Sequence, residues 1–309
     1  MSIAFVFPGQ GSQSPGMGRD LRDRFELAAA AFDEADAALD SPISAACFEG
    51  SAEDLALTET TQPAILTCSI AAWRVLDGAG IRPSFVAGHS LGEWSALVAT
   101  GSLGLGPAVA TVRNRGRYMQ EAVPVGEGAM AALLGLDREQ VEAACLEQRQ
   151  EGEILQPANF NSAGQVVVAG HAVAVDRLLE AGAGGARRAV RLQVSAPFHC
   201  PLMQPAADRL AADLEALELG PMSCPLVANV DAEPRQDPEA ERQALLAQVT
   251  APVRWEDTVR TLVAAGVDTV VEVGPGKVLA GLVKKTDRSL KVLSAGDAAS
   301  VEQVLETLG

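Results

Sequence analysis

The sequence lacks the cysteine patterns that build disulfide-stabilised folds or hold zinc. Its five cysteines are odd in number and widely spaced, and no two of them form a C-x-x-C pair. This spacing argues against a disulfide framework and against a zinc site. We therefore expect reduced, mostly buried thiols and no bound metal.

Long hydrophobic runs and basic stretches are also missing. The N-terminal apolar stretch covers only residues 3–7 before Pro8, has no basic leader and offers no membrane span, so we expect a cytoplasmic protein with no membrane partner. Asp and Glu number 40 against 24 Lys and Arg, which gives a formal net charge of −16. Such a surface would repel a phosphate backbone, which excludes nucleic acid as a partner.

The sequence does contain a regular alternation of strand-like and helical segments, which predicts an α/β fold with a mainly parallel sheet. The expected strands are residues 3–7, 84–88, 225–230, 268–273 and 290–293. The expected helices are residues 92–100, 202–217, 252–265 and 276–285.

A different rhythm fills the middle of the chain. It reads as a strand at 128–136, a helix at 137–148 capped by Asp137, strands at 154–160 and 165–170, a helix at 172–182 and a strand at 187–195. This β-α-β-β-α-β order is that of a ferredoxin-like unit. We therefore predict a large α/β domain made of residues 1–125 and 196–309, with a ferredoxin-like subdomain, residues 126–195, inserted into it.

Ser90 is the candidate nucleophile. It stands between Gly88 and Gly92 where an apolar strand gives way to a helix, and Gly-x-Ser-x-Gly at such a junction lifts a serine out of the sheet on a tight turn. The backbone N–H of Leu91 then starts the helix beside it and can stabilise an oxyanion. A second donor can come from the glycine-rich loop after the first strand, with the amide of Gln10 as the best candidate.

A serine nucleophile needs a base, and the chain has three histidines. His89 adjoins Ser90 and more plausibly packs against the sheet or orients the loop. His171 resembles a surface or capping residue. His199 follows the insertion in a proline-punctuated loop and is the expected base, the alternative being a buried structural histidine. No partner acid stands at a telling position, so a backbone carbonyl could orient the imidazole instead.

Arg115 is the basic residue that helical spacing places on an apolar face, while Arg113 and Arg117 point elsewhere. A buried guanidinium needs an anionic or multiply accepting partner. A salt bridge to a protein carboxylate or bonds to backbone carbonyls is the default expectation. Bidentate binding of a substrate carboxylate is the functional alternative.

Nucleotide motifs are incomplete in both glycine-rich loops. The loop at Gly9 and Gly11 lacks the third glycine of G-x-G-x-x-G, and the GPGK at 274–277 does not complete a Walker motif. No nucleotide cofactor is expected.

Seven segments together resemble the malonyl-CoA:acyl carrier protein transacylases, in order and over residues 3–285. They are FVFPGQGSQ, GHSLGEWSALVA around Ser90, RNRGRYMQ around Arg115, NFNSAGQVVVAG, APFHCPLM around His199, PVRW and EVGPGKVL. The resemblance implies an α/β-hydrolase-like large domain and a ping-pong reaction through a malonyl-serine ester. Malonyl-CoA is then a substrate and no cofactor is needed.

The resemblance also implies residue roles. Ser90 would be acylated, His199 would be its base, and the Gln10 and Leu91 amides would form the oxyanion hole. Arg115 would bind the malonyl carboxylate, which reverses the default expectation of a salt bridge. Gln248 matches the family position whose backbone carbonyl orients the histidine. Phe198 resembles the malonyl-preferring pattern of related polyketide synthase acyltransferases.

The implied partner is an acidic acyl carrier protein, to which this chain would bind as a monomer through a local basic patch. The candidate patch residues are Arg187, Arg188, Arg191, Lys277, Lys284 and Lys285, and scattered solvated charges are the alternative. Three other functions stay open: a trans-acting acyltransferase of a polyketide pathway, a serine thioesterase or editing hydrolase, and a non-catalytic carrier-binding subunit.

Overall fold

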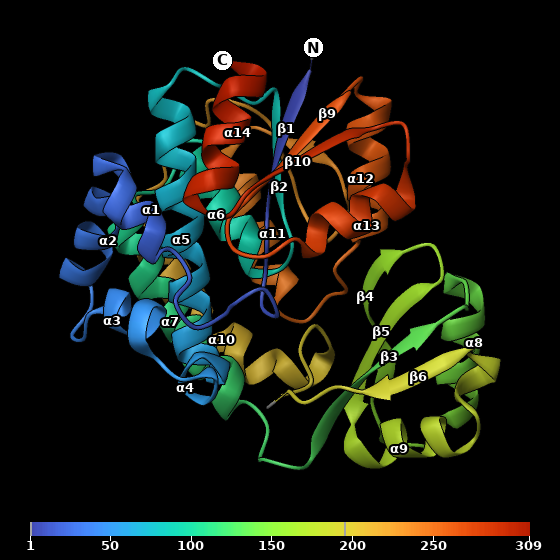
Figure 1. Cartoon of the computed structure of the whole chain (residues 1–309). Coiled ribbons are helices and arrows are strands. Elements are labelled where there is room, and N and C mark those ends of the chain that lie inside the picture. The colour runs from blue at the N-terminus through green and yellow to red at the C-terminus, as the bar shows by residue number, and fades with distance from the viewer. Residues whose placement is uncertain (1, 195) are drawn as a thin grey trace.

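A six-stranded sheet forms the centre of the larger part of the molecule in this computed structural model, which describes residues 2–194 and 196–309 (Figure 1). Its strands lie in the order β10-β9-β1-β2-β7-β8. The first five of these pair in parallel, and β8 pairs antiparallel with β7. Their bounds are β1 Ile3–Phe7, β2 Phe85–Gly88, β7 Leu226–Val227, β8 Pro234–Arg235, β9 Thr269–Val273 and β10 Lys291–Ala295.

Helices cover both faces of this sheet, and the side chains of each parallel strand point alternately toward one face and the other. In β1, Phe5 and Phe7 pack into the larger apolar cluster with α5, α6 and α14, and Ala4 and Val6 pack into a second cluster with α12 and α13. The helices of this part are α1 Arg19–Arg24, α2 Glu26–Ala37, α3 Ile43–Glu49, α4 Ala52–Ala56, α5 Thr58–Gly78, α6 Leu91–Ala99, α7 Leu105–Glu121, α10 Gln204–Ala216, α11 Pro238–Gln248, α12 Trp255–Ala264, α13 Val278–Thr286 and α14 Ala298–Leu308, with a 3₁₀ turn at Pro201–Met203.

A second, antiparallel sheet lies to one side, with its own apolar cluster (Figure 1). Its strands lie in the order β4-β5-β3-β6. In chain order the elements are β3 Gly128–Leu134, α8 Arg138–Gln148, β4 Leu155–Ser162, β5 Gln165–His171, α9 Ala172–Glu180, a 3₁₀ turn at Ala183–Gly185 and β6 Arg188–Arg191. This is the β-α-β-β-α-β order that the sequence predicts, and Asp137 caps α8 as expected, in a capping box with Gln140.

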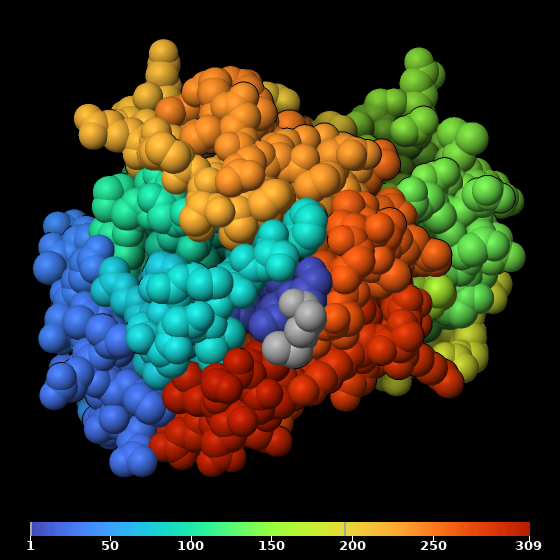
Figure 2. All heavy atoms as spheres, turned by 90° about the horizontal axis from the view of Figure 1, so that it is seen from above, coloured from blue at the N-terminus to red at the C-terminus, as the bar shows by residue number. Residues whose placement is uncertain are grey.

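The two parts are joined along the outer edge of β4. The N–H of Phe160 donates to the carbonyl of Val253 at 2.9 Å, and the N–H of Val253 donates to the carbonyl of Ala158 at 2.9 Å. An ion pair of 2.6 Å between Arg138 on α8 and Asp257 on α12 reinforces the junction. The space-filling view shows the same contact, where the green subdomain abuts the orange segment of the larger part (Figure 2).

Three expected elements differ most in length. The strand expected at 187–195 ends at Arg191, because the chain then leaves the sheet to line a cavity; Ser195 lies outside the described residues. The strand expected at 225–230 keeps only Leu226–Val227 before the chain turns, with Ala232 at φ 61°. The helix expected at 252–265 starts at Trp255, because Val253 pairs with β4.

Within the described residues, no helix is both long and apolar enough to cross a membrane. All five cysteines are buried.

Candidate active site

Ser90 lies on a sharp turn between β2 and α6. Its backbone has φ 52° and ψ −107°, a region that side chains other than glycine rarely occupy. The turn also requires both flanking glycines. A Cβ at Gly88 would come within 1.9 Å of the carbonyl carbon of Gly92, and a Cβ at Gly92 would come within 1.9 Å of the carbonyl oxygen of Phe7. The Gly-x-Ser-x-Gly pattern thus follows from close backbone approach at the carboxyl edge of the sheet.

His199 faces the Ser90 hydroxyl. Its Nε2 lies 2.8 Å from Ser90 Oγ, and its Nδ1 lies 2.9 Å from the backbone carbonyl of Gln248. A carbonyl can only accept, so Nδ1 carries the proton and Nε2 is free to accept the proton of the serine. The structure thus places a carbonyl, with no charge of its own, where many serine enzymes have a carboxylate.

Burial keeps the His199 imidazole neutral. Its side chain is 3% exposed, and this burial, aided by the positive charge of Arg115, lowers the pKa of His199 to about 3. The neutral ring therefore persists through the physiological range, ready to act as a general base.

Arg115 reaches the same serine from α7. Its Nη2 donates to Gln248 Oε1 at 2.8 Å and to Ser90 Oγ at 3.3 Å, and its Nη1 donates to Gln62 Oε1 at 2.6 Å. These partners are neutral amides and a hydroxyl, and no ion pair with Arg115 occurs in the described part of the chain. The default expectation of a salt bridge or of backbone carbonyl partners was therefore wrong.

The guanidinium remains a cation in this setting. Burial lowers the pKa of Arg115 to about 10, which still leaves it protonated near neutral pH. Its Nε has no hydrogen-bond partner among the described atoms. A buried positive charge held only by neutral groups, 3.3 Å from a candidate nucleophile, is suited to receive an anion.

A small cavity of about 120 Å³ connects these groups. Leu91 and Gln10 line it, and Leu91 is the first residue of α6, so its N–H has no acceptor within the helix. Phe198, 8% exposed, forms part of the apolar wall. The remaining lining residues are Gln62, His89, Ser90, Arg115, Met119, Met130, Asn159, Leu192, Val194 and His199.

The other two histidines have structural partners. His89 Nε2 lies 2.9 Å from Asn161 Oδ1 and its ring packs against Trp255, in agreement with its expected orienting role. His171 directly precedes α9, but its side chain does not cap the helix, because its Nδ1 accepts from the N–H of Ile154 at 2.8 Å.

Sequence reasoning missed the side chains of Gln62, Gln248 and Asn229 around this site. Gln62 follows the polar residues 58–61 at the start of α5, so its residue type does not stand out and the sequence carries no signal that could have identified it. Asn229 carried no such signal either, because it follows a strand in a segment where turns are common.

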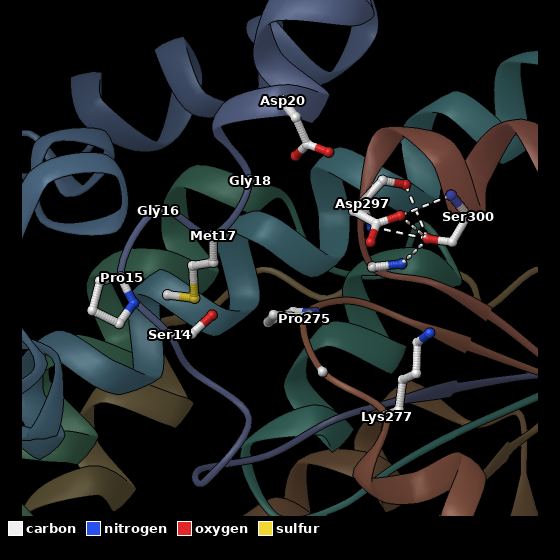
Figure 3. Close-up of a pocket in the computed structure, with 12 residues that line it drawn as sticks. Ser14, Pro15, Gly16, Met17, Gly18, Asp20, Pro275, Lys277, Asp297 and Ser300 are labelled. Atoms are coloured by element: carbon white, nitrogen blue, oxygen red, sulfur yellow. Dashed lines mark hydrogen bonds between the residues drawn. The ribbon is translucent and has the colours of Figure 1, made fainter.

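The six candidate docking residues do not line this cavity. All six are exposed. Lys277 instead borders a separate cavity of about 450 Å³ between the glycine-rich loop and the start of α14 (Figure 3). Arg191 pairs with Asp176, and Lys285 donates to Gln165 Oε1 at 3.1 Å.

No group of three or more His, Cys, Asp or Glu side chains that could hold a metal ion occurs in residues 2–194 and 196–309.

Comparisons with known proteins agree on one family. A family profile described as "Acyl transferase domain" matches residues 4–307. A malonyl CoA-acyl carrier protein transacylase of Bacillus subtilis is 47% identical over 307 residues, covering 99% of this chain and 97% of the relative. An acyl-carrier-protein-S-malonyltransferase structure from Bartonella henselae superposes with a TM-score of 0.96 at 46% identity, covering all of both chains.

A further solved structure contains a malonyl-transacylase in complex with its type II PKS acyl-carrier protein. It superposes with a TM-score of 0.96 at 47% identity and covers 99% of this chain and 100% of that one.

The low pKa of His199 predicts the pH dependence of Ser90 reactivity. Protonated imidazole cannot accept the serine proton, so reactivity falls only as pH approaches about 3, and the rate of Ser90 labelling by a fluorophosphonate should be flat from pH 8 to about pH 5. Intact mass spectrometry after timed exposure measures this rate. An inflection at the ordinary imidazole pKa of about 6.5 contradicts it.

A control tests whether the titration of another buried group, Glu93, contributes to this labelling profile. Burial raises the pKa of Glu93 to about 7, and Glu93→Gln removes that titration, so its labelling profile should be equally flat.

Proposed function

The chain belongs to the acyl transferase domain family, and from this premise we propose that it transfers a malonyl group from malonyl-CoA to the phosphopantetheine thiol of an acyl carrier protein. The observation that carries the proposal is Arg115, a buried cation beside the Ser90 hydroxyl that forms no ion pair with the described residues. The malonyl group differs from a simple acyl group by its free carboxylate, which is the anion that such a cation selects. The names of the relatives support a role in fatty acid biosynthesis.

The first half-reaction forms a malonyl ester on the enzyme. Ser90 gives its proton to Nε2 of His199 as Oγ attacks the thioester carbonyl, and the N–H groups of Leu91 and Gln10 stabilise the oxyanion. The tetrahedral intermediate then collapses, the C–S bond breaks, and His199 returns the proton to the departing CoA sulfur. The carbonyl of Gln248 holds the ring in the required tautomer throughout.

The second half-reaction reverses these steps with a new thiol. His199 takes the proton of the carrier's phosphopantetheine thiol, and the thiolate attacks the malonyl ester. The ester C–O bond breaks, and the proton passes back to Ser90 Oγ. The charge on Arg115 holds the carboxylate in both halves, so the ester keeps one orientation toward the incoming thiol.

Gln62 and Gln248 make Arg115 selective. Their amide oxygens fix the guanidinium without neutralising it, so a substrate carboxylate gains the full interaction with the charge. Phe198 is proposed to crowd a methyl group at the α-carbon, which favours malonyl over methylmalonyl; its place in the cavity wall supports this.

Several broader assignments belong to the same proposal. We describe the larger part, residues 1–125 and 196–309, as α/β-hydrolase-like and residues 126–195 as a ferredoxin-like inserted subdomain, supported by the strand orders and by a separate apolar cluster in the subdomain. We propose a cytoplasmic monomer that needs no cofactor, since malonyl-CoA is a substrate. A polyketide pathway is the alternative destination, because one similar transacylase serves a type II PKS carrier.

Docking of the carrier is proposed at the basic residues of α13 and of the subdomain. Gln165 pairs with Leu134, and Leu134 with Arg188, so Lys285 and Arg188 lie at the same end of the four-stranded sheet. Lys284 adjoins Lys285, and Arg187 precedes Arg188. Arg191 stands at the end of β6 from which the chain runs to the cavity, and Lys277 precedes α13. An acidic carrier would meet several exposed positive charges there.

The central test is intact mass spectrometry after brief incubation with malonyl-CoA, beside acetyl-CoA. We expect a malonyl adduct that Ser90→Ala abolishes and that an acyl carrier protein discharges. Free malonate without an adduct that passes to the carrier indicates a serine hydrolase. Full function of Ser90→Ala indicates a non-catalytic subunit.

Loss of the Arg115 charge should change acyl selectivity. In Arg115→Ala, kcat/KM for malonyl-CoA should fall at least about 100-fold, since charge-assisted bonds to the carboxylate are lost, while relative activity toward acetyl-CoA rises. Gln62→Glu should act in the same direction by neutralising the guanidinium in place. Arg117→Ala, on the exposed side of α7, is the control. Unchanged selectivity in both variants rejects this role for Arg115.

Charge reversal should uncouple carrier transfer from the CoA reaction. Lys284→Glu with Lys285→Glu should raise KM for the carrier about tenfold and leave Ser90 acylation by malonyl-CoA unchanged, because the two lysines do not line the catalytic cavity. Arg22→Glu with Arg24→Glu, on α1 in the larger part (Figure 1), makes the same charge change as a control. Equal loss in both half-reactions contradicts docking at α13.

A further inference from the structure

Asn229 occupies the place where pairing between β2 and β7 stops. The paired residues are Val86 with Leu226 and Ala87 with Val227, and beyond them β2 leads into the Ser90 turn. Asn229 follows β7 by two residues and is fully buried. It therefore lies beside the turn, at the carboxyl edge of the sheet.

The side chain of Asn229 completes the hydrogen bonds of that turn. Its Oδ1 accepts from the N–H of Ser90 at 2.7 Å, and its Nδ2 donates to the carbonyl of Gly88 at 2.6 Å. A primary amide offers one acceptor and one donor side, as a peptide unit does, so Asn229 substitutes for the strand backbone that is missing here. Without it, the N–H of Ser90 and the carbonyl of Gly88 would each lose this partner.

This contact opposes the strain at Ser90. A backbone with φ 52° at a residue other than glycine is strained and persists only when its surroundings enforce it. Asn229 hydrogen-bonds to the backbone of Gly88 and of Ser90, the residues on either side of His89. It thereby holds Ser90 Oγ at the observed 2.8 Å from His199.

Asn229 is itself fixed through its backbone. Its N–H donates to Glu93 Oε2 at 2.6 Å, and its carbonyl accepts from the N–H of Arg254 at 3.0 Å. Glu93 is fully buried in the first turn of α6, close to the buried carboxyl group of Glu241 on α11. Asn229 is thus tied to α6 and to the segment that leads into α12.

A second contact of Asn229 sets the orientation of Gln248. The Nε2 of Gln248 donates to the carbonyl of Ser90 at 3.0 Å and to Asn229 Oδ1 at 3.4 Å, so its Oε1 is left to accept from Arg115. A flipped amide would bring NH₂ against the guanidinium. The oxygen of Asn229 opposes that flip.

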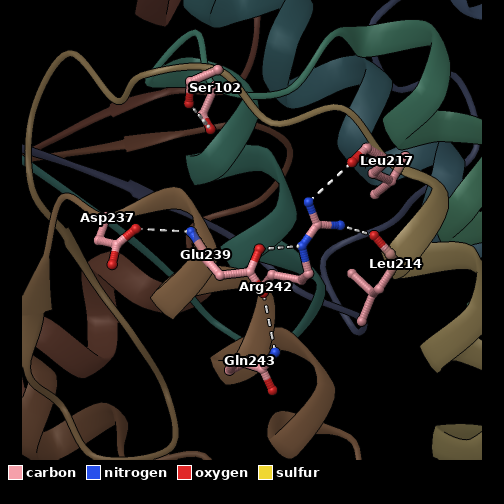
Figure 4. Close-up of polar contacts among 8 residues, drawn as sticks. Ser102, Leu214, Leu217, Asp237, Glu239, Arg242 and Gln243 are labelled. Atoms are coloured by element: carbon pink, nitrogen blue, oxygen red, sulfur yellow. Dashed lines mark hydrogen bonds and ion pairs between the residues drawn. The ribbon is translucent and has the colours of Figure 1, made fainter.

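The rest of α11 is anchored independently of this site. Arg242 donates to the carbonyl of Leu217 at 3.0 Å and to that of Leu214, and Asp237 accepts from the N–H of Glu239 at the start of the helix (Figure 4). Loss of the Asn229 side chain would therefore disturb the local orientation of Gln248 and Ser90 while α11 stays in place.

We propose that Asn229 is a positioning residue of the acyl transfer, which holds the Ser90 turn in its reactive conformation and fixes the side-chain amide of Gln248 toward Arg115. The role in malonyl transfer rests on the proposed function. The role in Ser90 reactivity does not, because it follows from the contacts of the turn alone.

The first test removes the amide. In Asn229→Ala, fluorophosphonate labelling of Ser90 and kcat for malonyl transfer should each fall about 100-fold, the usual effect of a displacement of about 1 Å in a reacting group, with KM for malonyl-CoA within a fewfold of wild type. Asn114→Ala is the matched control, because the Asn114 side chain also donates and accepts, to Asp213 and from Arg117, without touching the turn.

The second test keeps the shape of the residue 229 side chain but makes its donor proton titratable. In Asn229→Asp, a protonated carboxyl can accept from Ser90 N–H and donate to the Gly88 carbonyl as the amide does, whereas the ionised form presents an acceptor to that carbonyl and a second negative charge beside Glu93. The labelling rate relative to wild type should be within threefold at pH 5 and about 100-fold lower at pH 9.

Taking the ratio to wild type at each pH removes the titrations that the two proteins share. The titratable groups around the turn are His89 within it, Glu93 on α6, Arg115 on α7, His199 before α10, Arg235 on β8 and Glu241 on α11. Asn114→Asp should give a ratio that does not change with pH.

Three outcomes decide the proposal. A pH-dependent ratio for Asn229→Asp supports it, even where Asn229→Ala fails to fold. A ratio that does not vary with pH, or wild-type labelling of folded Asn229→Ala, overturns it. If the wild-type protein reacts with fluorophosphonate but forms no malonyl adduct, the proposed function fails, and the labelling data still decide the role of Asn229.

Discussion

A guanidinium held in the protein interior by uncharged partners is the constraint on which this site depends. Burying Arg115 is costly, and an ion pair with a carboxylate would be the ordinary way to offset that cost. Here two glutamine side chains accept its hydrogen bonds, and no carboxylate of the described residues forms an ion pair with it. That arrangement affects much around it, since the same charge adds to the burial that keeps His199 neutral and favours an anion as a further partner.

The sequence predicts those parts of the site and fold that depend on local spacing. Ser90 is evident from two glycines that the backbone leaves no room to replace, and Arg115 from a helical face on which a charge is out of place. The alternating strands and the unit from β3 to β6 follow from periodicity. His199 was found by elimination among three histidines and by its loop. These signals need no knowledge of distant contacts.

Groups that act across long sequence separations were not predictable in this way. Asn229 meets Ser90 139 positions away, and Gln62 meets Arg115 53 positions away. Asn229 reaches Ser90 because strands far apart in the chain end at one edge of the sheet, and Gln62 reaches Arg115 because α5 packs against α7. The early end of β6 also depends on distant contacts. Leu192 and Val194 line the cavity instead of continuing the strand, although local strand propensity favours a longer one.

The junction at Val253 also determines which margin of the four-stranded sheet is open to other strands. By pairing with β4, that segment covers one margin of the four-stranded sheet and leaves β6 as the open margin. An open margin offers unpaired backbone groups to any other strand, including that of a second copy. All four residues of β6 are exposed and two of them are arginines, so copies approaching margin to margin would repel one another. The charges proposed to attract an acidic carrier would thus also oppose pairing of β6 with a strand of another copy.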